Sequence, residues 1–419
     1  MARKGRFGFT VMRVKNRGYA MNDNETPVQN SPKTDGYLAK VGETIQATAN
    51  KIQRLVQGYR SQAEQHIALF GESGSGKTTL LTVFYGYQQD INFQKESGYS
   101  LRADDSTQGQ TLLNSFWNLS STPPTRLESR KYSFTIRLKT GSDGVSKDAA
   151  HLVWHDYPGG WWTETRTGEE QKDKEQTFLS LMSSDVALFL VDGDKLKESG
   201  DRYLKRLFCN FRDELGRLKE YPALKNRFPL THFPRIWLIC LSKADLLPEM
   251  TAESFKQRVL SVANDELQAV KREIQEIIEV PELFTLGDDY LLLSAAEYDE
   301  NNDRITNLEK REGVDLVVPI AFTVPIKRSL AWAKRKGSAI SKTATAIEFI
   351  RRLTSAWLKW LPFVGYYFGL VDQLAKDQIA NLNEKKEEAI KKGFFIDAVL
   401  IAFEQKLSAH GIENTYLCR

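Results

Sequence analysis

The segment from Gly71 to Thr78 has the residue types and spacing of a phosphate-binding loop. It reads Gly-Glu-Ser-Gly-Ser-Gly-Lys-Thr and matches the pattern G-x-x-x-x-G-K-[ST]. The glycines let the backbone curl so that several N–H groups face one anion, and the N-terminus of a following helix adds partial positive charge. We expect Lys77, as a catalytic group, to reach the β- and γ-phosphates of a nucleoside triphosphate, and the Thr78 hydroxyl to bind Mg²⁺. The nucleotide-binding residues predicted here are Gly71, Glu72, Ser73, Gly74, Ser75, Gly76, Lys77, Thr78 and Thr79.

A second candidate group follows the apolar run 152–154. Asp156 stands at the predicted strand end, where a carboxylate can hold Mg²⁺ through water opposite the phosphate loop. Gly159 can offer its backbone N–H to a γ-phosphate. On its own, the pattern D-x-x-G is only a turn at a strand end. After a phosphate loop, it predicts the metal and γ-phosphate side of the site.

Two further strand ends carry residues that could select a base. In Ser242-Lys243-Ala-Asp245, the carboxylate can accept two hydrogen bonds, from guanine N1–H and N2–H₂, a donor pair that adenine lacks. The Lys243 stem can lie along the purine ring. At the next strand end, Ser294, Ala295 and Ala296 could present a backbone N–H to guanine O6. The alternative is that these are two unrelated strand ends.

These groups need a sheet that brings several strand ends together. Short apolar runs alternate with helical stretches, and continuous apolar runs suit strands that are buried on both faces of a parallel sheet. We therefore predict an α/β fold, a three-layer sandwich with a mostly parallel sheet. The expected strands are 67–70, 132–138, 152–154, 186–191, 236–241 and 290–293, the second and third forming an antiparallel hairpin, and the expected helices are 37–65, 78–87, 197–220 and 252–279.

Three other parts of the chain complete the predicted organisation. The interposed region 89–131 is polar and long for a loop, so it is expected to carry its own structure or a function. Residues 314–324 contain strand-like runs, with Pro319 among them and Pro325 directly after them, which leaves a strand and a kinked helix open. Further helices are expected near the C-terminus, the last at 394–407. The predicted organisation is a basic arm and linker at 1–36, a nucleotide-binding domain at 37–335 and a helical C-terminal module at 336–419.

Composition limits the class of protein. The chain has 419 residues, 41% of them hydrophobic and 27% charged, which excludes a disordered chain, a collagen or a coiled coil. A net charge of +4 is too balanced to indicate nucleic-acid binding. Three cysteines form no disulfide framework, which favours a reducing, cytoplasmic compartment. The absence of a long apolar run argues against a spanning helix.

Taken together, the motifs resemble P-loop GTPases of the translation-factor and Ras-like class. The segments 71–78, 156–159, 242–245 and 294–296 match the first, third, fourth and fifth motifs of that class in order, over about residues 64 to 300. The Asp-x-Pro-Gly form is similar to dynamin-like and septin-like GTPases and to bacterial large GTPases. The resemblance implies GTP/GDP and Mg²⁺ as ligands, and a switch threonine at Thr125 that closes over Mg²⁺ as a metal ligand and catalytic group.

Two departures from the family pattern bear on activity. Ser242 replaces the usual Asn or Thr, which weakens the expectation of guanine selectivity, and Gly160 stands where a water-orienting Gln is common. We therefore expect slow intrinsic hydrolysis, with catalytic groups supplied by a protein partner or homodimer, or in cis by Arg126 or Arg130. His155, beside Asp156, is either a water-orienting base or a structural histidine on the opposite sheet face, and His66 is expected to be structural.

The aromatic stretch within 347–374 is dense in Trp, Tyr and Phe beside cationic residues. It could be folded core, a peripheral membrane contact or a partner surface. The leading functional hypothesis is a GTP-hydrolysing switch or mechanochemical GTPase. The alternatives are a P-loop ATPase of bacterial type and a nucleotide-binding scaffold with little hydrolysis.

Overall fold

The computed structural model describes these residues: 63–119, 130–140, 145–156, 175, 178–180, 182–222, 224, 228–230, 232–298, 305–337, 366–367, 370, 382–409 and 414–418. All of them belong to the compact unit Ala49–Arg419; the other unit, Met1–Thr48, lies outside the described residues. The predicted arm and linker 1–36 therefore lie outside them too, as do most of 347–374.

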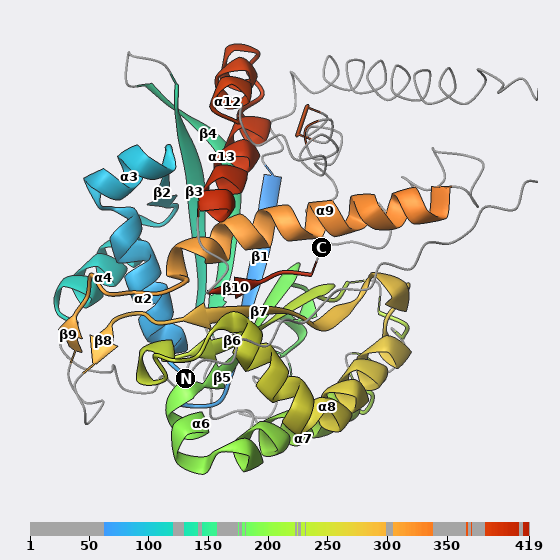
Figure 1. Cartoon of the computed structure of the whole chain (residues 1–419). Coiled ribbons are helices and arrows are strands. Elements are labelled where there is room, and N and C mark those ends of the chain that lie inside the picture. Colours follow the sequence, from blue (N-terminus) through green and yellow to red (C-terminus); the bar gives the residue numbers. More distant parts are fainter. Residues whose placement is uncertain are drawn as a thin grey trace, which may run out of the picture. The chain divides into compact units, whose positions relative to one another are not determined.

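One eight-stranded sheet organises the described chain, in the order β10-β7-β6-β5-β1-β4-β3-β2 (Figure 1). The strands from β7 to β4 run parallel, whereas β4–β3, β3–β2 and β10–β7 pair antiparallel. The structure thus confirms the predicted α/β class, the mostly parallel sheet and the hairpin. The strands are β1 (Ala63–Phe70), β2 (Tyr99–Ala103), β3 (Arg130–Thr140), β4 (Val145–Asp156), β5 (Val186–Asp192), β6 (Ile236–Ser242), β7 (Thr285–Leu293) and β10 (Thr415–Tyr416), with a separate pair β8 (Glu297–Tyr298) and β9 (Ile305–Asn307).

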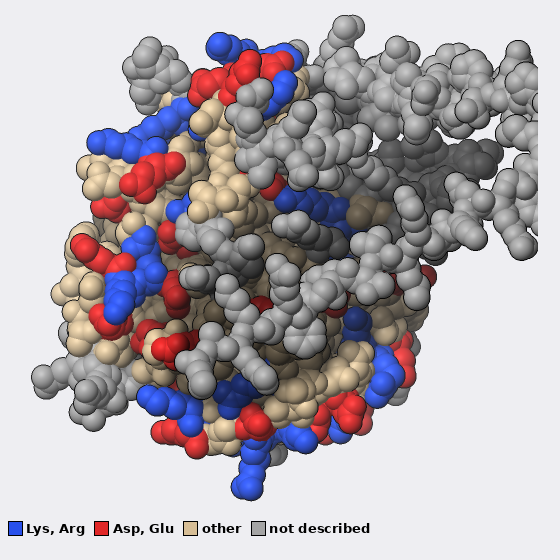
Figure 2. All heavy atoms as spheres, in the orientation of Figure 1, with Lys and Arg blue, Asp and Glu red and all other residues tan. Residues whose placement is uncertain are grey.

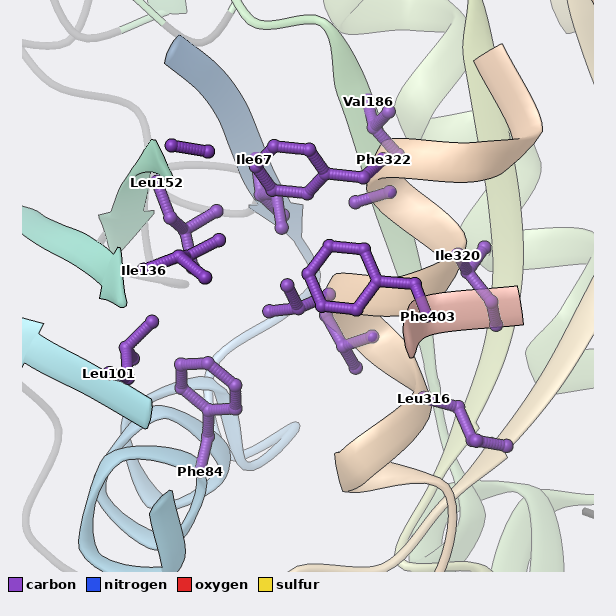
Figure 3. Packing of buried hydrophobic residues seen from close by; sticks show 14 of the residues in the cluster. Ile67, Phe84, Leu101, Ile136, Leu152, Val186, Leu316, Ile320, Phe322 and Phe403 are labelled. Atoms are coloured by element: carbon purple, nitrogen blue, oxygen red, sulfur yellow. The ribbon is translucent and has the colours of Figure 1, made fainter. Parts of the chain in front are cut away.

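Helices cover both faces of this sheet, as a three-layer sandwich requires. Alternate residues of β1 point to opposite faces, so that Ile67 and Leu69 join one core cluster and Ala68 and Phe70 the other. On the first face, Figure 3 shows Ile67 near Phe322 and Phe403, from the helices α9 and α13. The other face is covered by α7 and α8. The described helices are α2 (Lys77–Gln88), α3 (Ile91–Ser97), α4 (Ser106–Trp117), α6 (Gly193–Ser199), α7 (Asp201–Leu218), α8 (Ala252–Ile277), α9 (Val317–Gly337), α12 (Leu382–Lys391) and α13 (Phe395–Ala409), with short 3-10 turns at Ala244–Leu246, Pro281–Leu283 and Val314–Leu316.

Several expectations are refined by the structure. The interposed region does carry its own structure, since α3, β2 and α4 lie within it and β2 extends the sheet through β3. The expected helix 37–65 is wrong at its end, because residues 63–65 already belong to β1, where they pair with β4. Residues 317–324 begin a helix rather than a strand, and Pro325 lies inside it. No helix in the described part of the chain is long and apolar enough to cross a membrane.

Candidate nucleotide-binding site

The phosphate loop lies between β1 and α2, as its sequence pattern requires. Gly74 and Gly76 have φ values of 81° and 83°, a left-handed backbone that L side chains rarely adopt. The Lys77 ammonium lies inside the loop and donates to the carbonyl oxygens of Gly71 at 2.8 Å and Glu72 at 2.9 Å. Burial lowers the pKa of Lys77 to about 8, against the opposing pull of Asp156. The loop thus holds its lysine through two of its own carbonyl oxygens.

The predicted metal ligands Thr78 and Asp156 meet beside this loop. The Thr78 hydroxyl donates to Asp156 Oδ2 at 3.0 Å, across 78 residues of sequence. They meet because β1 and β4 are parallel neighbours, so that their carboxyl ends lie at the same edge of the sheet. A hydroxyl and a buried carboxylate at this distance are oxygen donors of the kind that Mg²⁺ prefers, and they fit such an ion.

The two motifs predicted to select a base also meet. The Ser294 hydroxyl lies 2.7 Å from Asp245 Oδ1 and 2.9 Å from the Ala296 carbonyl oxygen. Burial raises the pKa of Asp245, and the Ser294 hydrogen bond opposes that shift. Ser294 is in turn fixed by a two-way backbone bridge to Glu312, at 3.0 Å and 2.9 Å. Asp245 is therefore held in one orientation at the carboxyl ends of β6 and β7.

Ser242 and Lys243 connect this group to the end of β5. The Ser242 hydroxyl donates to the Val191 carbonyl at 3.2 Å, and Lys243 Nζ lies 3.0 Å from Asp192 Oδ1. Lys243 has a φ of 53°, in the left-handed region that residues other than glycine rarely adopt. A Cβ on Gly193 would lie 2.6 Å from the Ser242 carbonyl oxygen and 2.7 Å from that of Lys243. Only glycine, which has no side chain, lets the backbone after β5 pass this close to residues 242–245.

Some predicted residues cannot be placed in this arrangement. Thr125 and Gly159 lie outside the described residues, as does Arg126. Arg130, the other candidate arginine, begins β3 and stands opposite Asp156 in the β3–β4 ladder. The structure thus brings together Lys77, Thr78 and Asp156 in one group, and Asp245 and Ser294 in another.

The loop residues Glu72 and Ser73 have partners that the sequence did not reveal. Glu72 Oε2 accepts from Lys195 Nζ at 2.9 Å and lies 3.5 Å from Arg206 Nη2, while Lys195 also donates to the Ser73 carbonyl at 3.1 Å. Asp192 was missed as well, although it ends a buried apolar run just as Asp156 does. No pattern in the sequence pointed to Lys195 or Arg206.

His155 lies away from the Thr78–Asp156 contact. Its Nε2 is 3.2 Å from Nδ1 of His66, and the two rings stack at 5.4 Å. Burial lowers the pKa of His155 to about 3, helped by the charge of His66. A ring that stays neutral and packs against a second histidine fits the structural interpretation better than that of a water-orienting base.

A family model described as Double-GTPase 2 matches residues 65–282, just over half of the chain. No curated protein matches. Among solved structures, the chain is similar to the signal recognition particle receptor SRb-GTP/SRX complex from Chaetomium thermophilum, at 18% identity and a TM-score of 0.29, over 55% of this chain and 90% of that one. It is also similar to the S. cerevisiae Ski7 GTPase-like domain bound to GTP, at 16% identity and a TM-score of 0.27, over 56% and 43%. Likenesses at these TM-scores say nothing about the activity of this chain.

Proposed function

The chain belongs to the Double-GTPase 2 family, and on that premise we propose that it is a GTP-hydrolysing, nucleotide-dependent switch or mechanochemical GTPase. The observation that carries the proposal is the meeting of Asp245 with Ser294 at one strand edge that also holds Thr78 beside Asp156. The first pair supplies an acceptor for guanine, and the second supplies ligands for Mg²⁺. GTP and GDP are the proposed ligands.

Each residue of the site has its own role in this proposal. Lys77 binds the β- and γ-phosphates, and the N–H groups of the loop and of the N-terminus of α2 hold the phosphate chain. Thr78 and Asp156, with Thr125, would hold Mg²⁺, which neutralises charge on the phosphates. Asp245 reads the guanine edge, Lys243 lies along the ring, and Ser294 to Ala296 bind O6. The backbone N–H of Gly159 donates to the γ-phosphate.

We expect hydrolysis to be slow without a second molecule, because Gly160 cannot orient water through a side chain. A partner or a second copy of the chain would supply the missing groups, and turnover would then rise more than linearly with protein concentration.

Peripheral membrane contact through residues 347–374 is a further part of the proposal, and co-sedimentation with anionic vesicles tests it. Lysines, arginines and acidic residues are interspersed on the described surface in view in Figure 2, without a single-sign patch.

The test of the assignment is equilibrium binding of fluorescent GDP, GTP and ATP analogues with Mg²⁺, for wild type and for Asp245→Ala. We expect wild type to prefer guanine and the variant to lose that preference. Equal binding of ATP and GTP by wild type, with no effect of the substitution, would leave an ATPase or another P-loop protein in place of a GTPase. Tight guanine binding without turnover at any protein concentration would favour the scaffold alternative.

A further inference from the structure

Asp192 ends β5 as a buried acid that holds the lysine of residues 242–245. Its side chain is 1% exposed, and the Lys243 ammonium lies 3.0 Å from its Oδ1 and 3.1 Å from its Oδ2. Oδ1 also accepts from the Asp194 N–H at 3.1 Å, at the start of α6. Burial raises the pKa of Asp192, and the charge of Lys243 opposes that shift. The two side chains therefore form a close ion pair at the carboxyl end of β5.

The backbone on both sides of this ion pair is fixed as well. The Asp192 N–H donates to the Tyr203 hydroxyl at 3.0 Å. Ser242, directly before Lys243, donates through its hydroxyl to the Val191 carbonyl oxygen at 3.2 Å. Strands β5 and β6 are parallel neighbours, in which Asp192 stands opposite Ser242. The ends of two buried strands thus set the position of the Lys243 ammonium.

The order of the strands places this ion pair between the two halves of the proposed site. The phosphate loop follows β1 and Asp245 follows β6, and β5 lies between β1 and β6 in the sheet. A nucleotide with its phosphates in the loop and its base at Asp245 must therefore cross the carboxyl end of β5. The Lys243 side chain, which reaches that end, is 20% exposed, whereas that of Asp192 is buried. The lysine is the member of the pair that a ligand can touch.

An anchored lysine differs from a free one in the cost of a contact. A free lysine side chain samples many rotamers, and a contact that orders it loses part of its free energy to that ordering. In Lys243 the backbone fixes one end of the side chain and Asp192 holds the other. The methylene groups between the two ends form an apolar stem of fixed direction.

We propose that Asp192 is a positioning residue for the nucleotide base: by holding the Lys243 ammonium, it keeps the aliphatic stem of Lys243 against one face of the guanine ring. This inference rests on the proposed function, which assigns the ring contact to Lys243. Asp192 itself touches neither the base nor the phosphates. Its substitution should therefore weaken the binding of a ligand that has the ring, and should not weaken the binding of the sugar and phosphates alone.

The test compares a ligand that has the base with one that lacks it. Dissociation constants are measured for GDP and for ribose 5-diphosphate, which keeps the sugar and phosphates of GDP but has no ring. Ribose 5-diphosphate is titrated in competition with a fluorescent GDP analogue. A loss of affinity that is confined to GDP identifies an effect on the base, which a general disturbance of the site would not produce.

Three variants and one control separate positioning from a structural role. Asp192→Asn removes the charge and keeps an oxygen for the Asp194 N–H. Lys243→Ala removes the stem, and the double variant Asp192→Asn/Lys243→Ala removes both charges, so that neither is left unpaired. If Asp192→Asn alone does not fold, the comparison of the double variant with Lys243→Ala carries the test. Asp201→Asn is the matched control, since its carboxylate also pairs with a cation, Arg258 at 3.0 Å, but is 56% exposed.

We expect Asp192→Asn to weaken GDP binding ~5-fold, because the lysine must then be ordered when the base binds. The binding of ribose 5-diphosphate should not weaken. Lys243→Ala should weaken GDP binding at least as much as Asp192→Asn. The double variant should match Lys243→Ala, because Asp192 then has no lysine to position. Asp201→Asn should bind GDP as wild type does.

Three results would overturn the proposal. They are an equal weakening of GDP and ribose 5-diphosphate, an unchanged GDP affinity in Asp192→Asn, and a double variant that binds GDP more weakly than Lys243→Ala. In each case a guanine preference that depends on Asp245 would leave the proposed function standing. A wild-type protein that does not bind GDP would overturn the proposed function and this inference with it.

Discussion

The Asp245 carboxylate and the Ser294 hydroxyl lie 2.7 Å apart although 49 residues separate them in the chain. Each follows a buried strand, and the parallel pairing of β6 with β7 places the two strand ends side by side. The hydrogen bond fixes the orientation of the carboxylate. A preorganised acceptor of this kind loses less entropy on binding than a mobile one.

The first prediction concerns this pair. Ser294→Ala should weaken GDP binding about 5-fold, because one hydrogen bond to the carboxylate is lost while the carboxylate itself remains. Asp245→Ala should have the larger effect and should remove the preference for guanine over adenine. Titrations with fluorescent GDP and ADP analogues measure both. If Ser294→Ala had no effect on GDP affinity, the hydroxyl would not orient Asp245.

A second prediction tests the contact between Thr78 and Asp156. Mg²⁺ should increase the GTP affinity of wild type. In Thr78→Ala and in Asp156→Asn that increase should be smaller by ~10-fold or more, because each substitution removes an oxygen ligand from a site with few protein ligands. Affinity for GTP in EDTA should change much less. Binding is measured at a series of Mg²⁺ concentrations.

Thr78→Ser is the matched control for that experiment, since it keeps the hydroxyl and should respond to Mg²⁺ like wild type. A Thr78→Ala protein with an unchanged Mg²⁺ response would show that the 3.0 Å contact is only structural.

A third prediction concerns the close approach of Gly193 to the fourth motif. In Gly193→Ala, the new Cβ would meet backbone oxygens of Ser242 and Lys243 at 2.6 Å and 2.7 Å, which cannot move aside as a flexible side chain could. We expect the displaced peptide to weaken guanine-nucleotide binding and to lower the free energy of unfolding by ~2 kcal/mol.

Gly216→Ala supplies the control for this substitution. Gly216 lies within α7, and an added Cβ there meets nothing within 4 Å. Alanine favours a helix over glycine by up to ~1 kcal/mol, so this variant should be more stable and bind nucleotide normally. Urea denaturation should show a lower free energy of unfolding for Gly193→Ala and a higher one for Gly216→Ala, and titration should show weaker nucleotide binding only for Gly193→Ala. Equal stability of the two variants would refute the steric argument.

The part of the site that could be predicted is the part whose residues follow a strand end directly. Asp156, Asp245 and Ser294 each end or follow a buried apolar run, and a parallel sheet collects such ends at one edge. The same logic could have found Asp192, which ends β5 and binds Lys243. To predict Asp192, one would have had to consider every polar residue at a strand end.

Lys195 and the C-terminal strand could not be predicted in this way. Lys195 lies on a seven-residue helix with no unusual composition, and its partner is set by the pairing of β1 with β5. β10 has only two residues, too few for an alternating pattern, and it is fixed by β7 and by the Cys418 N–H, which donates to Asp289 at 3.1 Å. Pro319 and Pro325 left a strand and a kinked helix open for residues 314–324, and the structure shows a helix that is buried along its first turns.

The last prediction concerns Asp397, a buried carboxyl in the first turn of α13. Its Oδ1 accepts a hydrogen bond from the Tyr367 N–H at 2.7 Å. Burial nevertheless raises its pKa from 3.8 to about 7, a shift equivalent to about 4 kcal/mol at most. Between these two pH values the folded protein holds a proton that the unfolded chain has lost. The free energy of unfolding that depends on Asp397 therefore falls as the pH rises from about 4 to about 7.

Asp397→Asn keeps an oxygen that can accept from Tyr367 but cannot ionise. We expect it to match wild type near pH 4 and to exceed it in stability at pH 8, by an amount that grows across that window. The difference in urea midpoint between the two proteins removes the contribution of the other titrating groups to the pH dependence of stability. Asp289 is one of these groups, since burial raises its pKa to about 6. Asp265→Asn, on the exposed face of α8, is the matched control for the loss of one carboxyl group. A constant offset between Asp397→Asn and wild type at every pH would mean that Asp397 does not change its charge in this range.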